Sequence, residues 1–589
     1  MTKLRLGTTA IACILIGILA SCASPDARSR DQNPSVTPGQ ESAPLPPPPA
    51  PPPPPPAPPP PPPMPSPPMA GVVAPFLAGR AESSRLSQFP PQRPAGIEDR
   101  EQYEDVELNP IRVTAEDPVS TFSIDVDTAS YANVRRFLRN GQLPPRDAVR
   151  IEELINYFDY DYPLPTARTT PFQPSVQLVP SPWAEGRTLL HIGLQGYDLI
   201  ASERPALNLV LLLDVSGSMA DANKLPLAIQ GFRALVEQLN SRDRVSIVVY
   251  AGAAGAVLEP TPGDQRQRIN AAFDQLSAGG STAGGEGLAL AYAMAERNFN
   301  RNAINRVIIA TDGDFNVGVT QNERLEDFVA RKRESGVYLS VLGFGGGNYN
   351  DALMQTLAQN GNGIAAYIDT LAEARRVLSD EMGRALFPIA NDVKIQVEFN
   401  PGRVAEYRLI GYETRMLNRE DFNNDRVDAG EIGAGASVTA IYELTAPGGA
   451  TLVDPLRYQS ARQSAAPSSE IGFLRIRYKL PGETESRLIE RAITDRDASP
   501  RLDQAPEATR WATAVAAYGQ LLRGDPYLTN GYGWADVISL AQSARGADAF
   551  GWRAEFLQLV RGAQSASAAN DTSARPQQSE PPPRPLPRR

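Results

Sequence analysis

Between residues 205 and 390, the pattern of apolar and polar positions alternates between strands and helices. Two segments with apolar residues three and four positions apart, 225–239 and 325–336, predict helices. Short apolar runs predict the strands that separate such helices, at residues 207–214, 244–252, 306–313, 337–345 and 364–370. Apolar strands that alternate with helices indicate a parallel sheet with helices on both faces. We therefore expect an α/β domain with a Rossmann-like, doubly wound sheet over residues 205–390.

After residue 391 the periodicity changes from helical to period two. The resulting β-rich domain, residues 391–500, is expected to be an antiparallel sandwich with strands at 392–400, 407–414, 437–445 and 472–480. Helices follow in residues 501–563. An N-terminal α+β segment, residues 101–200, contains two further strands at 172–198. We hypothesise that these two strands pair with the later ones, so that the α/β domain is an insertion.

Two segments have a composition that cannot form a core. Residues 23–100 are a linker, predicted to be disordered, and its proline run from Pro44 to Pro68 favours polyproline II. At about 3.1 Å per residue, this run spans roughly 75 Å and would act as a spacer. Recognition of the same run by another protein's domain is the alternative. Residues 564–589 are expected to be a disordered tail.

The first 22 residues are typical of a lipoprotein signal peptide. Lys3 and Arg5 precede an apolar run that is too short for a membrane-spanning helix, and the run ends in Leu-Ala-Ser-Cys. This ending resembles the bacterial lipobox, which implies that Cys22 is lipidated and becomes the N-terminus. By resemblance to Gram-negative lipoprotein sorting, the absence of Asp after Cys22 favours the outer membrane, at its periplasmic face or the cell surface. An ordinary signal peptide with an incidental cysteine is the alternative.

Charge and residue counts exclude several classes of function. The formal net charge is -10 and no long basic block occurs, which argues against nucleic acid as a partner. The chain has one histidine, His191, within a strand-like segment where a packed residue is expected. Ser-His-Asp catalysis and histidine-ligated zinc are therefore disfavoured. Cys13 and Cys22 are the two cysteines, so the chain has no disulfide framework.

Polar side chains follow two of the predicted parallel strands and precede one predicted helix. The candidate site consists of Asp214, Ser216, Ser218, Thr282 and Asp312. In an open parallel sheet, ligands bind beyond the carboxyl ends of the strands, so these side chains are expected to converge. Two carboxylates and three hydroxyls without sulfur or imidazole suit Mg²⁺, or Mn²⁺ or Ca²⁺. Taken singly, the serines, the threonine and Asp312 also suit turns or helix caps.

The pattern D-x-S-x-S, a threonine about seventy residues later, and then T-D-G resembles the metal-ion-dependent adhesion site of von Willebrand factor type A domains. All five positions match. The resemblance implies that a divalent cation bound here accepts a carboxylate from a partner protein.

A second resemblance covers residues 105–565. Segments such as "NPIRVTAEDPVSTFSIDVDTASYANVRRFL" and "DFNNDRVDAGEIGAGASVTAIYEL" are similar to YfbK-type bacterial lipoproteins. These lipoproteins combine a von Willebrand factor type A domain with a C-terminal domain of unknown function.

Three weaker signals remain. Residues 421–431 carry Asp421, Asn423, Asp425, Asp428 and Glu431, but Arg426 and Ile432 occupy positions where a calcium loop needs Gly and Glu. A polar hairpin turn is favoured there, with a second ion as the alternative. Asp125 and Asp127 suit an exposed strand face better than a paired-carboxylate site. The glycines of residues 343–350 lack the spacing of a dinucleotide-binding loop.

Together these features favour a non-enzymatic, metal-dependent binding protein of the bacterial cell envelope, either an adhesion or a scaffold lipoprotein. Its expected partners are an envelope protein that presents an acidic residue and the membrane that holds its lipid anchor. A metal-dependent hydrolase of a small anionic substrate is the first alternative. A purely architectural domain, whose ion only orders three loops, is the second.

Overall fold

The computed structural model describes residues 101–574, apart from 167–168, 201, 281–283, 314–321, 348, 381, 455 and 457–468. Cys22, Thr282, the proline-rich linker and residues 575–589 of the tail lie outside the described residues. By its internal contacts the chain divides into two units, and the described residues all belong to the second unit, Pro90–Arg589.

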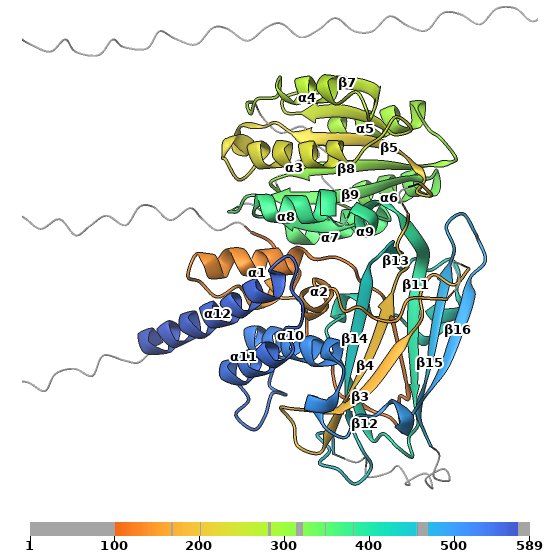
Figure 1. Ribbon diagram of the computed structural model, residues 1–589, viewed down its shortest axis with the longest axis vertical. Coiled ribbons are helices and arrows are strands. Elements are labelled where there is room, and N and C mark those ends of the chain that lie inside the picture. The colour runs from red at the N-terminus through yellow and green to blue at the C-terminus, as the bar shows by residue number, and fades with distance from the viewer. Residues whose placement is uncertain are drawn as a thin grey trace, which may run out of the picture. The chain divides into compact units, whose positions relative to one another are not determined.

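The α/β part is built on a six-stranded sheet with the strand order β10-β9-β8-β5-β6-β7 (Figure 1). Its strands are β5 (Ala206–Asp214), β6 (Arg244–Tyr250), β7 (Ala254–Pro262), β8 (Ala303–Thr311), β9 (Val337–Phe344) and β10 (Ala365–Ile368). All neighbours in the sheet are parallel except β6 and β7. The chain leaves β5 toward β6 and returns on its other side at β8, which makes the carboxyl end of β5 a topological switch point.

Helices cover both faces of this sheet, which confirms the doubly wound α/β fold. One face packs against α3 (Leu225–Glu237), α4 (Arg266–Phe273) and α8 (Leu371–Arg375). The other face packs against α5 (Gly284–Arg297), α6 (Asn322–Glu334) and α7 (Asp351–Asn360). Strand β7 was not expected. It contains Pro260 and Pro262, which an antiparallel edge strand tolerates.

The period-two strands form two antiparallel sheets, as expected. The first has the order β1-β12-β14-β4-β3, and the second has the order β13-β11-β15-β16 with β2 paired to β11. The strands are β1 (Arg112–Val113), β2 (Val119–Ser123), β3 (Ser175–Pro180), β4 (Arg187–Gln195), β11 (Pro388–Phe399), β12 (Glu406–Ile410), β13 (Gly430–Gly433), β14 (Ser437–Thr445), β15 (Glu470–Lys479) and β16 (Arg487–Thr494). Strand β4 pairs with β14 along its whole length, which confirms the insertion hypothesis because β4 precedes the α/β part and β14 follows it.

Helices from both ends of the described chain pack together on the first of these sheets (Figure 1). They are α1 (Ala129–Arg139), α2 (Ile151–Asn156), α10 (Glu507–Arg523), α11 (Trp534–Ser543) and α12 (Trp552–Ala574), while α9 (Met382–Leu386) lies beside β13. His191 of β4 is buried and lies 3.2 Å from the Thr513 hydroxyl of α10. Burial lowers the pKa of His191 to about 3, as befits the packed histidine that was predicted.

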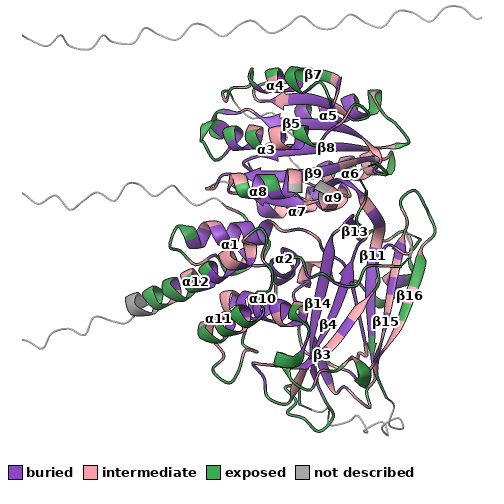
Figure 2. Cartoon of the chain, in the orientation of Figure 1, coloured by how far each residue is buried: buried purple, intermediate pink, exposed green. Residues whose placement is uncertain are grey.

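Burial follows this layered arrangement. The central strands of all sheets are buried, whereas β16 presents an exposed edge (Figure 2). Over the described residues, every helix is too short or too polar to cross a membrane.

Candidate metal site at the end of strand β5

Asp214 ends the central strand β5 and is fully buried. One of its carboxylate oxygens accepts a hydrogen bond from the backbone N–H of Ser216, at 2.8 Å. The hydroxyl of Thr311, from the end of β8, donates to the other oxygen at 3.4 Å. The side chain is therefore held by the turn that follows it and by the neighbouring strand.

The two serines lie in that turn with their hydroxyl groups together. The Oγ atoms of Ser216 and Ser218 are 3.0 Å apart, with Ser216 buried and Ser218 exposed. A short 3-10 helix, Gly217–Ala220, begins directly after Ser216. The two hydroxyl groups are thus held together on a locally fixed backbone, with Ser218 at the surface.

A second loop is hydrogen-bonded to this turn. The N–H of Gly279 donates to the carbonyl of Val215 at 2.7 Å, and the N–H of Gly217 donates to the carbonyl of Gly280 at 3.1 Å. Thr282 itself lies outside the described residues, two positions after Gly280. The structure therefore brings the chain that leads to Thr282 onto the loop of Ser216 and Ser218.

Asp312 follows β8, the strand directly beside β5, and is fully buried. Its Oδ2 accepts a hydrogen bond from the ammonium group of Lys224 at 2.9 Å. Four of the five predicted side chains are thus described, and all four lie at the same edge of the sheet.

Burial raises the pKa of the Asp214 carboxyl above its ordinary value. Hydrogen bonds from Ser216 oppose this increase, whereas the negative charge of Asp312 adds to it. Two carboxylates that repel each other in a buried setting are stabilised by a positive charge between them. A bound cation would supply such a positive charge.

The donor set fits a hard divalent cation, because two carboxylates and the serine hydroxyls offer only oxygen. Over the described part of the chain, no group of three or more His, Cys, Asp or Glu side chains could hold a metal ion. A site at the end of β5 therefore depends on its hydroxyl groups.

Two contacts of this site were not predicted from the sequence. Lys224 pairs with Asp312, and Tyr250 is the residue of β6 that lies beside Asp214. Tyr250 could have been found from strand alignment, since it lies opposite Asp214 in the register of β5 and β6. Lys224 lies at the start of a helix, and no motif distinguishes it.

Comparison with known proteins places these features in a family. Residues 208–380 match the von Willebrand factor type A domain, residues 97–191 match "von Willebrand factor", and residues 384–566 match "Uncharacterized protein YfbK, C-terminal". "Uncharacterized protein YfbK" of Escherichia coli (strain K12) is 47% identical over 466 residues, which cover 78% of this chain and 80% of that protein. The chain belongs to the YfbK family.

Other similarities to this YfbK-family chain are more distant. Human inter-alpha-trypsin inhibitor heavy chain H3 is 24% identical over 254 residues, which are 40% of this chain and 28% of that protein. The solved structure of a von Willebrand factor type A protein from Catenulispora acidiphila is 16% identical, with a TM-score of 0.37, over 66% of this chain and 89% of that one. Von Willebrand factor type A domains generally serve as protein-interaction or adhesion scaffolds rather than as enzymes.

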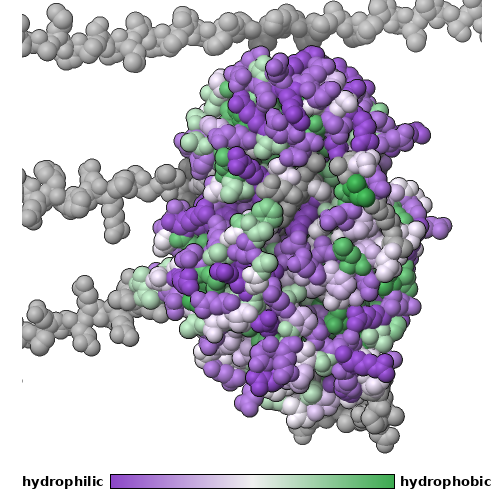
Figure 3. All heavy atoms as spheres, viewed as in Figure 1, coloured by the Kyte–Doolittle hydropathy of each residue, from purple (hydrophilic) through white to green (hydrophobic). Residues whose placement is uncertain are grey.

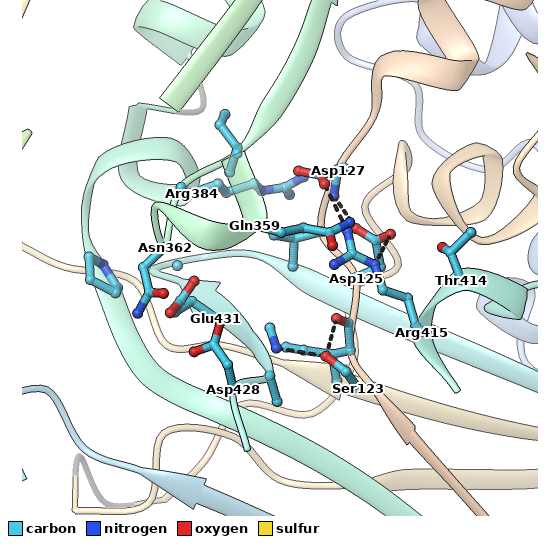
Figure 4. Close-up of a pocket in the computed structure, with 18 of the residues that line it drawn as sticks. Ser123, Asp125, Asp127, Gln359, Asn362, Arg384, Thr414, Arg415, Asp428 and Glu431 are labelled. Carbon is cyan, nitrogen blue, oxygen red and sulfur yellow. Dashed lines mark hydrogen bonds and ion pairs between the residues drawn. The ribbon is translucent and has the colours of Figure 1, made fainter. Parts of the chain in front are cut away.

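Two acidic segments, Asp125 with Asp127 and residues 421–431, both contribute to the lining of a cavity of about 160 Å³. Residues of the α/β part and of the β-rich part of this YfbK-family chain line the cavity. Figure 4 shows Asp125, Asp127 and Arg415 on one side of it and Asp428 and Glu431 on the other. The prediction that Asp125 and Asp127 lie on an exposed strand face is wrong. They are 3% and 4% exposed, because β2 ends at Ser123 and the α/β part covers the residues that follow.

Ion pairs and hydrogen bonds in this cavity connect the two parts of the chain. Arg415 donates to Asp125 at 2.8 Å and to Asp127 at 3.0 Å, while Asp127 accepts from the N–H of Ala365 in β10 at 2.8 Å. Arg333 of α6 pairs with Asp428 at 2.5 Å. These carboxylates therefore hold the α/β part against the β-rich part.

Asp421 and Asp425, in the segment 421–431, accept hydrogen bonds from other groups of the protein. Asp421 accepts from the N–H of Asn418 at 3.1 Å, and Asp425 accepts from the Ser486 hydroxyl at 2.6 Å. Burial raises the pKa of Glu431 well above its ordinary value, and the charges of Asp428 and Asp392 add to this effect. The described loop gives no support to a second ion.

Proposed function

We propose that this protein is a metal-dependent adhesion or scaffold lipoprotein of the bacterial cell envelope. The observation that carries the proposal is the convergence of Asp214, Ser216, Ser218 and Asp312 at the topological switch point of the sheet. Together with Thr282, these side chains would hold Mg²⁺, or Mn²⁺ or Ca²⁺, as a metal-ion-dependent adhesion site. The cation would supply a positive charge that accepts a carboxylate from a partner protein.

The chain's own residues prepare the site for that role. The Ser216 N–H and Thr311 hydroxyl orient Asp214, and Gly279 and Gly280 hold the serine turn in place. Ser218 is exposed, so a partner can approach the hydroxyl edge of the site without opening the fold.

The envelope location rests on the sequence of the N-terminus. Cys22 would carry the lipid anchor in the outer membrane, and residues 23–100 would separate the folded part from the bilayer. Several acyl chains hold stably, because each buried methylene contributes about 0.8 kcal/mol.

The test is capture of envelope proteins on the immobilised chain, with and without EDTA. We expect the wild-type protein to capture a partner only without EDTA, and the Asp312→Ala variant to capture none. Asp264→Ala is the matched control, since Asp264 is an exposed acid of the same domain. Capture that survives both EDTA and Asp312→Ala would exclude the metal-dependent role. Substrate turnover that Asp312→Ala abolishes would favour the hydrolase instead.

A further inference from the structure

Lys224 is a buried lysine in contact with Asp312, one of the candidate ligands. It is 6% exposed, lies at the N-cap position of α3, and donates from Nζ to Oδ2 of Asp312 at 2.9 Å. Buried lysines are rare unless they are paired, and the pairing with Asp312 is what allows Lys224 to be buried.

The aliphatic part of the Lys224 side chain packs against a glycine. Gly345 follows β9 with a φ of +74°, and a Cβ atom built on it would lie 2.3 Å from Cε, 2.7 Å from Cγ and 2.9 Å from Cδ of Lys224. The hydroxyl of Tyr367 donates to the carbonyl of the same glycine, which holds it in position. The glycine-rich segment that does not suit a dinucleotide thus makes room for the lysine.

The charge of Lys224 changes the electrostatic balance of the site. Asp214 and Asp312 together carry a formal charge of -2, and Lys224 reduces the total to -1. A divalent cation then brings the loaded site to +1, whereas without the lysine it would be neutral. A buried site with a net positive charge attracts an anionic group more strongly than a neutral one.

We propose that Lys224 sets the selectivity of this site: it weakens binding of the cation alone and makes the loaded site favour a carboxylate. This inference rests on the proposed function, because it assumes that a divalent cation binds at Asp214 and Asp312. Metal and partner would then bind together, and the bare cation would occupy the site only weakly.

The experiment is titration calorimetry of the full-length chain with Mg²⁺, in the absence and presence of acetate as a simple carboxylate. Lys224→Met removes the charge but keeps an apolar stem on Gly345. Without acetate, we expect the variant to bind Mg²⁺ about tenfold more tightly than wild type, which corresponds to about 1.4 kcal/mol. With acetate, the wild-type affinity for Mg²⁺ should rise more than that of the variant.

Two further variants serve as controls. Lys224→Arg keeps the charge and should stay close to wild type. Lys332→Met removes a lysine of α6 that pairs with Glu296 of α5, and this change should leave both affinities unchanged. If Lys224→Met does not fold, as judged by circular dichroism, Lys224→Gln replaces it with a neutral polar side chain.

The outcomes separate the inference from the function on which it rests. Equal or weaker Mg²⁺ affinity in Lys224→Met, with clear binding by wild type, overturns the role of Lys224 and leaves the metal site standing. Binding by Lys224→Met alone supports the lysine as the group that opposes the cation. Absence of Mg²⁺ binding in both proteins overturns the metal site and the inference together.

Discussion

At the scale of single residues, the fold buries several carboxyl groups whose ionisation it disfavours. Glu152 of α2 is fully buried and accepts a hydrogen bond from the N–H of Tyr412 at 2.9 Å. Burial raises the pKa of Glu152 to about 8, and the negative charges of Glu413 and Asp125 add to this effect. The folded state therefore retains a proton that the unfolded chain loses near pH 4.5.

This difference predicts a pH-dependent effect of Glu152→Gln. Stability from the protonated carboxyl is fully present below pH 4.5 and is lost as the pH rises through about 8, because ionisation then favours the unfolded chain. The glutamine cannot ionise, so its advantage over wild type should grow between pH 5 and pH 8, to about 1 kcal/mol or more. Thermal unfolding at several pH values checks this. A difference in stability between wild type and Glu152→Gln that stays the same at every pH would contradict the prediction.

At the scale of elements, buried ion pairs connect helices that lie far apart in the chain. Arg150, which precedes α2, pairs with Glu153 of the same helix and with Asp351 of α7 at 2.5 Å. All three side chains are at most 5% exposed. Removing one partner of such a group leaves uncompensated buried charges, which costs far more than losing an exposed pair.

We therefore expect Arg150→Met to lower the free energy of unfolding by about 3 kcal/mol or more. Arg501→Met is the control, since Arg501 pairs with Asp503 at the surface and both are at least 60% exposed. That change should leave the free energy of unfolding close to the wild-type value, because solvent screens an exposed pair. Urea unfolding measures both, and equal losses in the two variants would refute the structural role of Arg150.

The elements also show what the sequence could and could not predict. The strand of Asp214 was predicted because its apolar run is local, and the aspartate and serines follow it directly. Lys224 could not be assigned a partner, since its contact with Asp312 is 88 residues away in sequence and depends on the order of strands. Asp125 and Asp127 were misread because alternation cannot reveal that another domain covers them.

At the scale of the whole folded unit, the inserted α/β part shares its core with the helices around it. Ala129 and Ala132 of α1 belong to the same buried cluster as Met354 and Leu357 of α7. Arg135 of α1 also donates to the carboxylate of Asp369, at 2.9 Å. The insertion is thus packed against its host as well as joined to it.

The face of the molecule seen in Figure 3 is mainly hydrophilic, with apolar residues scattered over it.

This arrangement predicts that residues 204–387, expressed alone, are less stable than the full chain but keep the metal site. Separation exposes the apolar face that α1 covers and leaves Asp369 without Arg135, so the melting temperature should fall by several degrees. The candidate ligands, Lys224 and Gly345 all lie within residues 204–387, so the Mg²⁺ affinity should stay within about threefold of the full chain, under 1 kcal/mol. Differential scanning calorimetry of both proteins measures the melting temperatures, and Mg²⁺ titration measures the affinities. An unchanged melting temperature would show that the shared core contributes little. Loss of Mg²⁺ binding by a folded fragment would show that contacts with the host domain shape the site.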